Sequence, residues 1–138
     1  MGLTVLDAGV LIGALDSDDD YHAEAVAELR RAGIERDRLA TPASALAEAL
    51  VGPIRAGPEA ESLVERFIER LAIEVAPADA AVARTAARLR ARHGRDLLLP
   101  DALVVATAVV MKADRLVTTD GRWPSATKLG LSKRIVVL

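Results

Sequence analysis

The chain has 138 residues, of which 51% are hydrophobic and 28% are charged, and its formal net charge is −2. This length suits a single domain over residues 1–138 with one substantial core, and the composition excludes a disordered chain. Cysteine is absent, which excludes disulfides, thiolate metal sites and cysteine nucleophiles. Aromatic residues are scarce, so a nucleic acid would be held through its phosphates more than by stacked rings.

Neither the N-terminal segment nor the longest apolar segment predicts association with a membrane. The N-terminal segment lacks a basic region and reaches Asp7 too early for a signal peptide. The longest apolar run without a charge, residues 102–111, is too short to span a bilayer. We therefore expect a cytoplasmic protein.

The first part of the chain predicts two strands separated by two helices. Residues 3–6 form a short apolar strand, and residues 10–15 follow as a short helix. The acidic run at 16–20 breaks the chain and offers capping groups for a helix over 21–32. Residues 38–41 are the second strand candidate.

The middle of the chain predicts two further helices and a strand. Pro42 stands where a helix tolerates proline best, in its first turn, and that helix runs towards Gly52-Pro53. Residues 59–71 carry apolar side chains at helical spacing. Residues 73–75 are the third strand candidate.

The last part of the chain repeats the alternation. Residues 79–92 predict a helix that ends at His93-Gly94. A helix over 100–112 and strands over 115–118 and 134–137 follow. Short apolar strands that alternate with helices indicate an α/β domain in which helices cover both faces of a mainly parallel sheet. Sites in such folds lie at the carboxyl ends of the strands.

Three acids stand alone in apolar segments. They are Asp7 within residues 1–15, Glu48 within 39–54 and Asp101 within 97–111. A carboxylate in apolar surroundings is costly unless it is paired, hydrogen-bonded or bound to a metal, and no basic side chain is close in sequence. These acids therefore predict a site that compensates their charge.

The expected topology brings these acids together with a fourth. Asp7 closes the first strand and Asp120 follows the strand over 115–118, while Asp101 lies in the first turn of its helix and Glu48 about two turns into its own. Carboxylates that converge repel one another, and a divalent cation relieves this repulsion. Oxygen ligands favour Mg²⁺ or Mn²⁺, which points to hydrolysis of phosphodiesters.

Each acid taken alone also has a simpler interpretation. Asp101 suits the helix dipole, Asp120 with Gly121 suits a turn, and Asp7 suits a helix cap. Glu48 in the middle of a helix has no capping purpose. The joint pattern favours the metal site.

Four segments resemble the PIN-domain nucleases, in particular the VapC toxins of VapBC toxin–antitoxin pairs. They are residues 5–12, 43–50, 99–108 and 113–123, in the order that the family has them. The resemblance implies a PIN-like three-layer α/β/α domain and a Mg²⁺- or Mn²⁺-dependent endoribonuclease that leaves 5′-phosphate and 3′-hydroxyl ends. It also implies a homodimer, a VapB-type antitoxin that occupies the active-site groove, and tRNA or ribosomal RNA as substrate.

The same resemblance assigns roles to single residues. Asp7, Glu48, Asp101 and Asp120 hold the metal and position the attacking water, and Thr118 orients a carboxylate or the water. The chain departs from the family in two places. Trp123 stands where relatives usually have Phe, and Ala8-Gly9 stands where many carry Ser, Thr or Asn.

A basic stripe follows the helix over 79–92. Arg84, Arg88 and Arg92 recur at every fourth position, and Arg95 lies just beyond. Such a stripe is usually a solvated helix face. The alternative is a rail for RNA phosphates formed by Arg88, Arg92 and Arg95, because a nuclease this acidic needs basic contacts.

Other functions stay open. Within the PIN group, a housekeeping RNA-processing nuclease is not separated from a toxin by this chain alone. A catalytically idle PIN-like interaction module is disfavoured because all four acids are present. A phosphorylated receiver-like switch needs paired acids after the first strand and a lysine after a late one, and residues 6–8 and 118–120 supply neither.

Overall fold

The computed structural model describes residues 1–131 and 134–138. Five parallel strands form one sheet in the order β3-β2-β1-β4-β5. The strands are β1 (Leu3–Leu6), β2 (Arg38–Pro42), β3 (Glu74–Ala76), β4 (Arg115–Thr118) and β5 (Arg134–Val137). The expected parallel sheet is confirmed, and every strand pair in it is parallel.

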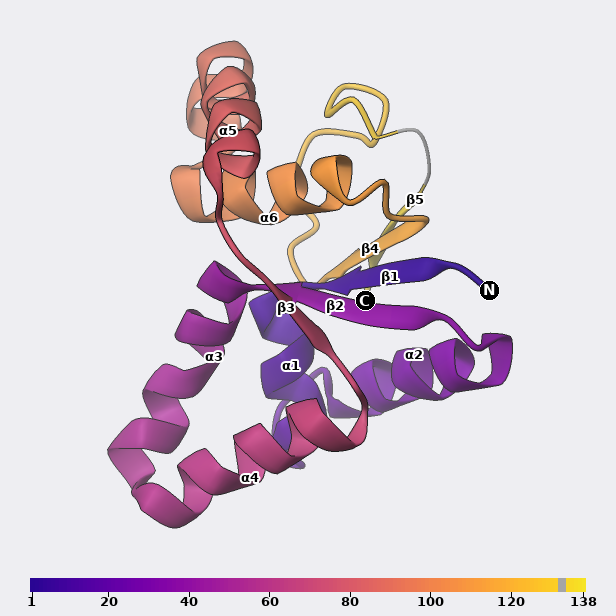
Figure 1. Cartoon of the computed structure of the whole chain (residues 1–138), viewed down its shortest axis with the longest axis vertical. Helices are drawn as coiled ribbons and strands as arrows, with labels where there is room; N and C mark the ends of the chain where they lie inside the picture. Colours follow the sequence, from indigo (N-terminus) through magenta and orange to yellow (C-terminus); the bar gives the residue numbers. More distant parts are fainter. Residues whose placement is uncertain (132–133) are drawn as a thin grey trace.

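Helices cover both faces of this sheet (Figure 1). They are α1 (Ala8–Leu15), α2 (His22–Glu35), α3 (Ala43–Ala56), α4 (Pro58–Arg70), α5 (Ala80–His93) and α6 (Leu99–Val110). Figure 1 shows α5 and α6 on one face of the sheet and α1, α2 and α4 on the other. This arrangement confirms the three-layer α/β/α domain. No helix in the described part of the chain is long and apolar enough to cross a membrane.

The helix expected to end near Gly52-Pro53 is longer than the sequence predicted. Helix α3 continues through Pro53 and ends at Ala56. A proline inside a helix removes one backbone donor but does not by itself stop the chain. The helix ends instead at Gly57, whose φ of 123° lies in the region that favours glycine, and whose N–H bonds to the carbonyl of Pro53.

Side chains that alternate along the strands pack into two separate hydrophobic cores, one on each face of the sheet. On β1, Val5 packs beneath α5 and α6, whereas Leu6 packs against α1 and its neighbours. On β4, Leu116 and Val117 divide in the same way. Successive strand residues point to opposite faces, so burial on both faces requires the unbroken apolar runs seen in the sequence.

The winding of the chain reverses between β1 and β4. From the central β1 the chain moves outward to β2 and β3, then returns to β4 on the other side of β1 and continues to β5. In open parallel sheets, ligands bind outside the carboxyl ends of the strands at such a switch point. The ends of β1 and β4 are therefore the place to look for a site.

Candidate active site

Asp7 lies at this switch point, where β1 meets the first turn of α1. Its Oδ1 accepts a hydrogen bond of 2.7 Å from the N–H of Ala8, so the residue does cap α1. Its Oδ2 accepts a bond of 2.8 Å from the hydroxyl of Thr118 at the end of β4. The side chain is 9% exposed. One oxygen of this carboxylate therefore caps α1, while the other is held by Thr118.

Thr118 joins two of the predicted acids. Its Oγ1 donates to Asp7 and also accepts a bond of 3.0 Å from the backbone N–H of Asp120. Thr118 is fully buried, so water cannot take the place of its hydroxyl in these two hydrogen bonds. The hydroxyl therefore links Asp7 to the chain after β4.

Asp101 faces the same place from α6. The residue lies in the first turn of that helix and is half-buried. Burial raises the pKa of Asp101, and repulsion from Asp7 and Asp120 raises it further. The indole Nε1 of Trp123 is buried and forms no complete hydrogen bond with any described residue. Its N–H group nonetheless attracts the carboxylate of Asp101 and so lowers the pKa of Asp101.

The sequence predicted apolar surroundings for Glu48, and this prediction is wrong. The side chain is exposed, because α3 packs through Ala45 and Ala49 and leaves Glu48 outside that contact. Glu48 nonetheless belongs to the cluster, since its charge is among the causes that raise the pKa of Asp7. The larger cause of that rise is the burial of Asp7.

The four acids are thus coupled by mutual repulsion. Asp7 is repelled by Glu48 and Asp120, and Asp101 is repelled by Asp7 and Asp120. Within residues 1–131 and 134–138, however, no three acidic or histidine side chains are close enough together to hold a metal ion between them. The structure brings the acids to one edge of the sheet without forming a closed cage.

The donor set still fits a hard divalent cation. Every candidate ligand is a carboxylate oxygen, the type that Mg²⁺ and Mn²⁺ take. Burial and like charge raise the pKa of Asp7, and in the described part of the chain no ion pair joins Asp101 to a basic side chain. Magnesium sites commonly use one or two carboxylates, with water and substrate phosphate in the other positions, so a closed cage is not required.

The arginine stripe lies on α5 and just beyond its end. Arg84, Arg88, Arg92 and Arg95 are all exposed, and no ion pair ties them down in the described part of the chain. Their neighbour Arg90 has a different role that the sequence analysis missed. Its guanidinium donates to the carbonyls of Gly94 and Leu97 and so holds the connection that leads into α6.

Two further residues near the site were missed. Arg122 pairs with Asp120, which the sequence shows only as a basic residue two places after an acid. Gly9 lies so close to Thr119 that a Cβ on the glycine would be 2.2 Å from Thr119 Oγ1. The glycine in the first motif was the available signal, because glycine often marks a close approach between segments.

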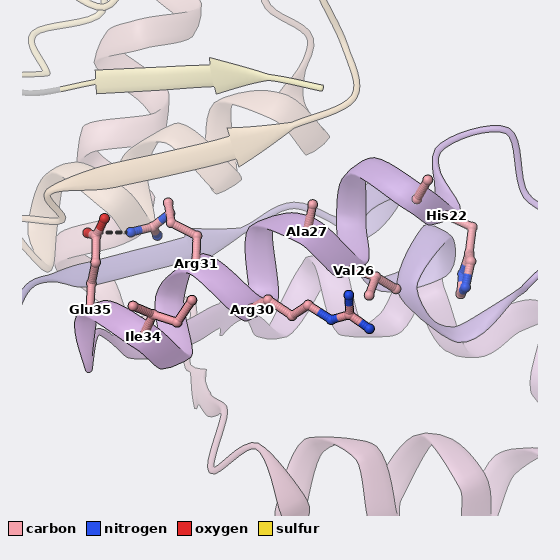
Figure 2. Close-up of a pocket in the computed structure, with 8 residues that line it drawn as sticks. His22, Val26, Ala27, Arg30, Arg31, Ile34 and Glu35 are labelled. Atoms are coloured by element: carbon pink, nitrogen blue, oxygen red, sulfur yellow. Dashed lines mark hydrogen bonds and ion pairs between the residues drawn. The ribbon is translucent and has the colours of Figure 1, made fainter.

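Two hollows of the surface differ in their relation to the acids. A groove of about 390 Å³ between α1, α3 and α4 has mostly apolar walls, with Glu48 among its lining residues. A second hollow of about 500 Å³ lies along α2 alone and contains the ion pair of Arg31 with Glu35 (Figure 2). The second hollow includes none of the four acids. A third hollow, of about 230 Å³, is lined by Asp120 and Trp123, so both this hollow and the groove beside Glu48 border the candidate site.

Comparison with known proteins places this geometry in a family. The family described as PIN domain matches residues 4–129. The fold is similar to VapBC2 from Rickettsia felis (17% identity over 97% of this chain and 96% of that one, TM-score 0.71). It is also similar to VapC20 from Mycobacterium tuberculosis, described as a sarcin–ricin loop cleaving toxin (18% identity, 86% and 90% covered, TM-score 0.68).

A third similar structure is more alike in sequence. VapBC-5 from Mycobacterium tuberculosis, a member of the VapBC family of toxin–antitoxin systems, shares 26% identity over the whole of both chains, with a TM-score of 0.60. No curated protein matches the chain significantly.

Proposed function

The chain belongs to the PIN-domain family, and from this premise we propose that it is a metal-dependent endoribonuclease and the toxin of a toxin–antitoxin pair. The observation that carries the proposal is the buried carboxylate of Asp7, held by Thr118 and repelled by Glu48 and Asp120. A protein maintains such repulsion at a sheet edge where a bound cation relieves it.

Asp7, Asp101 and Asp120, with Glu48 from the side of α3, are the residues that would hold Mg²⁺ or Mn²⁺. The cation would supply charge to a phosphate and lower the pKa of a water molecule. Thr118 keeps Asp7 fixed, so the carboxylate does not have to reorganise when the substrate arrives. Asp101 is half-buried and Glu48 is exposed, so both carboxylates are open to solvent and to a substrate in solution.

RNA is the substrate we favour over DNA. The support is the family together with one similar structure that is described as a sarcin–ricin loop cleaving toxin. The exposed arginines 88, 92 and 95 are the basic surface that a chain of net charge −2 offers for phosphates. We place the reaction in the cytoplasm, where RNA substrates are found.

The partner we propose is an antitoxin segment that lies in the groove beside Glu48. Two of the similar structures are VapBC assemblies. The groove has apolar walls that include the exposed side chains of Ile12 and Leu63, and its rim carries the acid. These features suit an amphipathic helix with a basic residue directed at the site. We also propose a homodimer, as in the resembled family.

The proposal is tested by incubating the purified protein with total cellular RNA in Mg²⁺, in Mn²⁺ and in a chelator, beside the variant Asp101→Asn. Cleavage with metal that is absent with chelator and in the variant supports the nuclease, and the products should carry 5′-phosphates. Equal cleavage by protein and variant, or 2′,3′-cyclic phosphate ends, would refute it.

Toxicity is tested separately from cleavage. Expression of the chain should arrest growth, and co-expression of a small protein encoded directly upstream should restore it. Metal-dependent cleavage without growth arrest favours a housekeeping RNA-processing nuclease, and absence of both favours the idle interaction module.

A further inference from the structure

Arg122 holds Asp120 by both carboxylate oxygens. Its Nε lies 3.1 Å from Oδ1 and its Nη2 lies 3.1 Å from Oδ2, while its backbone N–H bonds to Oδ1 at 2.9 Å. The pair is therefore bidentate, the geometry in which a guanidinium fits a carboxylate best. In this arrangement Arg122 faces both Asp120 oxygens that a cation would use.

Arg122 is also the cation most closely tied to the whole cluster. In the described part of the chain it is the only basic side chain in an ion pair with any of the four acids. Its charge also reaches Asp101, where it lowers the pKa of that carboxyl.

Among residues 1–131 and 134–138, the side chain of Arg122 forms hydrogen bonds and an ion pair with Asp120 alone. It is 90% exposed, whereas Asp120 is 22% exposed. The turn after β4 is already held by two backbone donors, the N–H groups of Asp120 and Arg122. Because Arg122 is 90% exposed, water solvates its guanidinium when it leaves Asp120, so the pair is easier to break than a buried one of the same bidentate geometry.

A divalent cation and a guanidinium compete for the same oxygens. When the cation takes Asp120, the guanidinium is released but stays attached two residues away, at the edge of the cluster. A guanidinium released there can bind the phosphate of a substrate at this cluster, which it also contacts through two donors.

Resting on the proposed function, we propose that Arg122 is a positioning residue that occupies Asp120 until a divalent cation displaces it, and then binds an RNA phosphate beside the scissile bond. The residue thus substitutes for the metal in the free protein and contacts the substrate in the loaded one.

The test compares wild type with Arg122→Gln, Arg122→Lys and the exposed control Arg30→Gln on α2. Two quantities are measured: the affinity for Mn²⁺ alone, by electron paramagnetic resonance of the free ion, and kcat and KM for total transfer RNA. Arg122→Gln should bind Mn²⁺ several-fold more tightly than wild type, yet show a KM raised by about tenfold, the loss of one charge-assisted contact. Arg122→Lys keeps the charge but not the bidentate pair, so it should fall between the two, and Arg30→Gln should match wild type.

Each result has a definite meaning. If Arg122→Gln binds Mn²⁺ with the affinity of wild type, the cation does not displace Arg122 from Asp120. If Arg122→Lys binds Mn²⁺ with the affinity of wild type, only the charge of Arg122 matters and the bidentate pair does not. An unchanged KM would overturn the phosphate contact. If wild type binds Mn²⁺ but cleaves no RNA, the proposed function fails while the Mn²⁺ affinities still decide the exchange, and absence of Mn²⁺ binding would overturn both.

Discussion

The hydroxyl of Thr118 donates a hydrogen bond of 2.8 Å to Oδ2 of Asp7, and so joins the carboxyl ends of two neighbouring parallel strands. The same oxygen accepts the N–H of Asp120. One buried hydroxyl therefore sets the spacing of two acids that are far apart in the sequence.

Thr118→Val keeps the volume and removes this hydroxyl. It leaves Oδ2 of Asp7 and the N–H of Asp120 without their partner, so we expect a loss of about 1–3 kcal/mol in the free energy of unfolding. RNA cleavage should fall by roughly 10–100-fold, as for other groups that orient metal ligands. Urea denaturation and single-turnover cleavage measure the two effects.

The matched control is Thr107→Val on α6. Thr107 is equally buried, but its hydroxyl bonds only to the carbonyl of Leu103 one turn earlier in the same helix. Cleavage by this variant should stay near wild type. If both valine variants lose activity alike, Thr118 has no special relation to the acids.

Asp101→Asn should stabilise the metal-free protein at neutral pH. The pKa of Asp101 is raised in the folded state, so between the unfolded and the folded pKa the folded chain binds more protons, and stability falls as the pH rises through that window. Above the folded pKa the carboxylate carries this penalty in full, and asparagine does not. Melting temperatures in chelator, at pH 4 and pH 7, should differ between variant and wild type mainly at pH 7.

Addition of Mg²⁺ should reverse this order. A cation that binds the folded state raises its stability, and the wild type has the carboxylate that binds it. A wild type that melts above Asp101→Asn in chelator, or that gains nothing from Mg²⁺, would contradict the repulsion on which the site is argued.

Gly9→Ala should destabilise the protein and reduce cleavage. The added Cβ would meet Thr119 Oγ1 at 2.2 Å and its Cβ and Cγ2 at 3.2 Å, so α1 and the chain after β4 must separate. Such overpacking costs about 1–3 kcal/mol. Thr119→Ala removes the closest atom, so the double variant should recover part of the loss in thermal melting.

Gly33→Ala on α2 is the control for this glycine. A Cβ there meets no atom within 4 Å, and the change should stabilise the helix by about 0.5–1 kcal/mol. Equal behaviour of the two alanine variants would show that the close approach at Gly9 is unimportant.

The combined change of Arg88, Arg92 and Arg95 to Gln tests the phosphate rail. The side chains are exposed, so thermal stability should change little. If they contact RNA, affinity falls and the slope of log K against log salt decreases by about 0.7 for each lost contact with a single strand. An unchanged slope assigns the stripe to a solvated helix face.

The sequence predicted the strands and the α-helices of the described chain, because apolar runs and helical spacing can be read from residue order alone, but it did not predict the short 3-10 helix Gly94–Asp96. It did not predict which face of α3 packs inward. Ala45 and Ala49, four residues apart, take the inner face, and Glu48 is exposed although its sequence neighbours are apolar. The predicted end of α3 near Pro53 was also wrong. The helix continues to Ala56 and ends at Gly57, which has a positive φ.

Asp7, Glu48 and Asp101 were predicted from their isolation among apolar residues and Asp120 from its place after a strand, but the contacts around these acids were not predicted. The pairing of Arg122 with Asp120 depends on the turn after β4. The approach of Gly9 to Thr119 depends on how α1 leaves β1. Both are contacts set by the tertiary fold, which residue patterns along one chain do not contain.

The most direct test of the carboxylate site is the anomalous diffraction of crystals soaked in Mn²⁺. We expect one strong peak at the carboxyl ends of β1 and β4, bounded by carboxylate oxygens of Asp7 and at least one of Asp101 and Asp120, with Arg122 no longer on Asp120. A peak elsewhere on the surface, or none at millimolar Mn²⁺ with the acids exposed to solvent, would contradict the account.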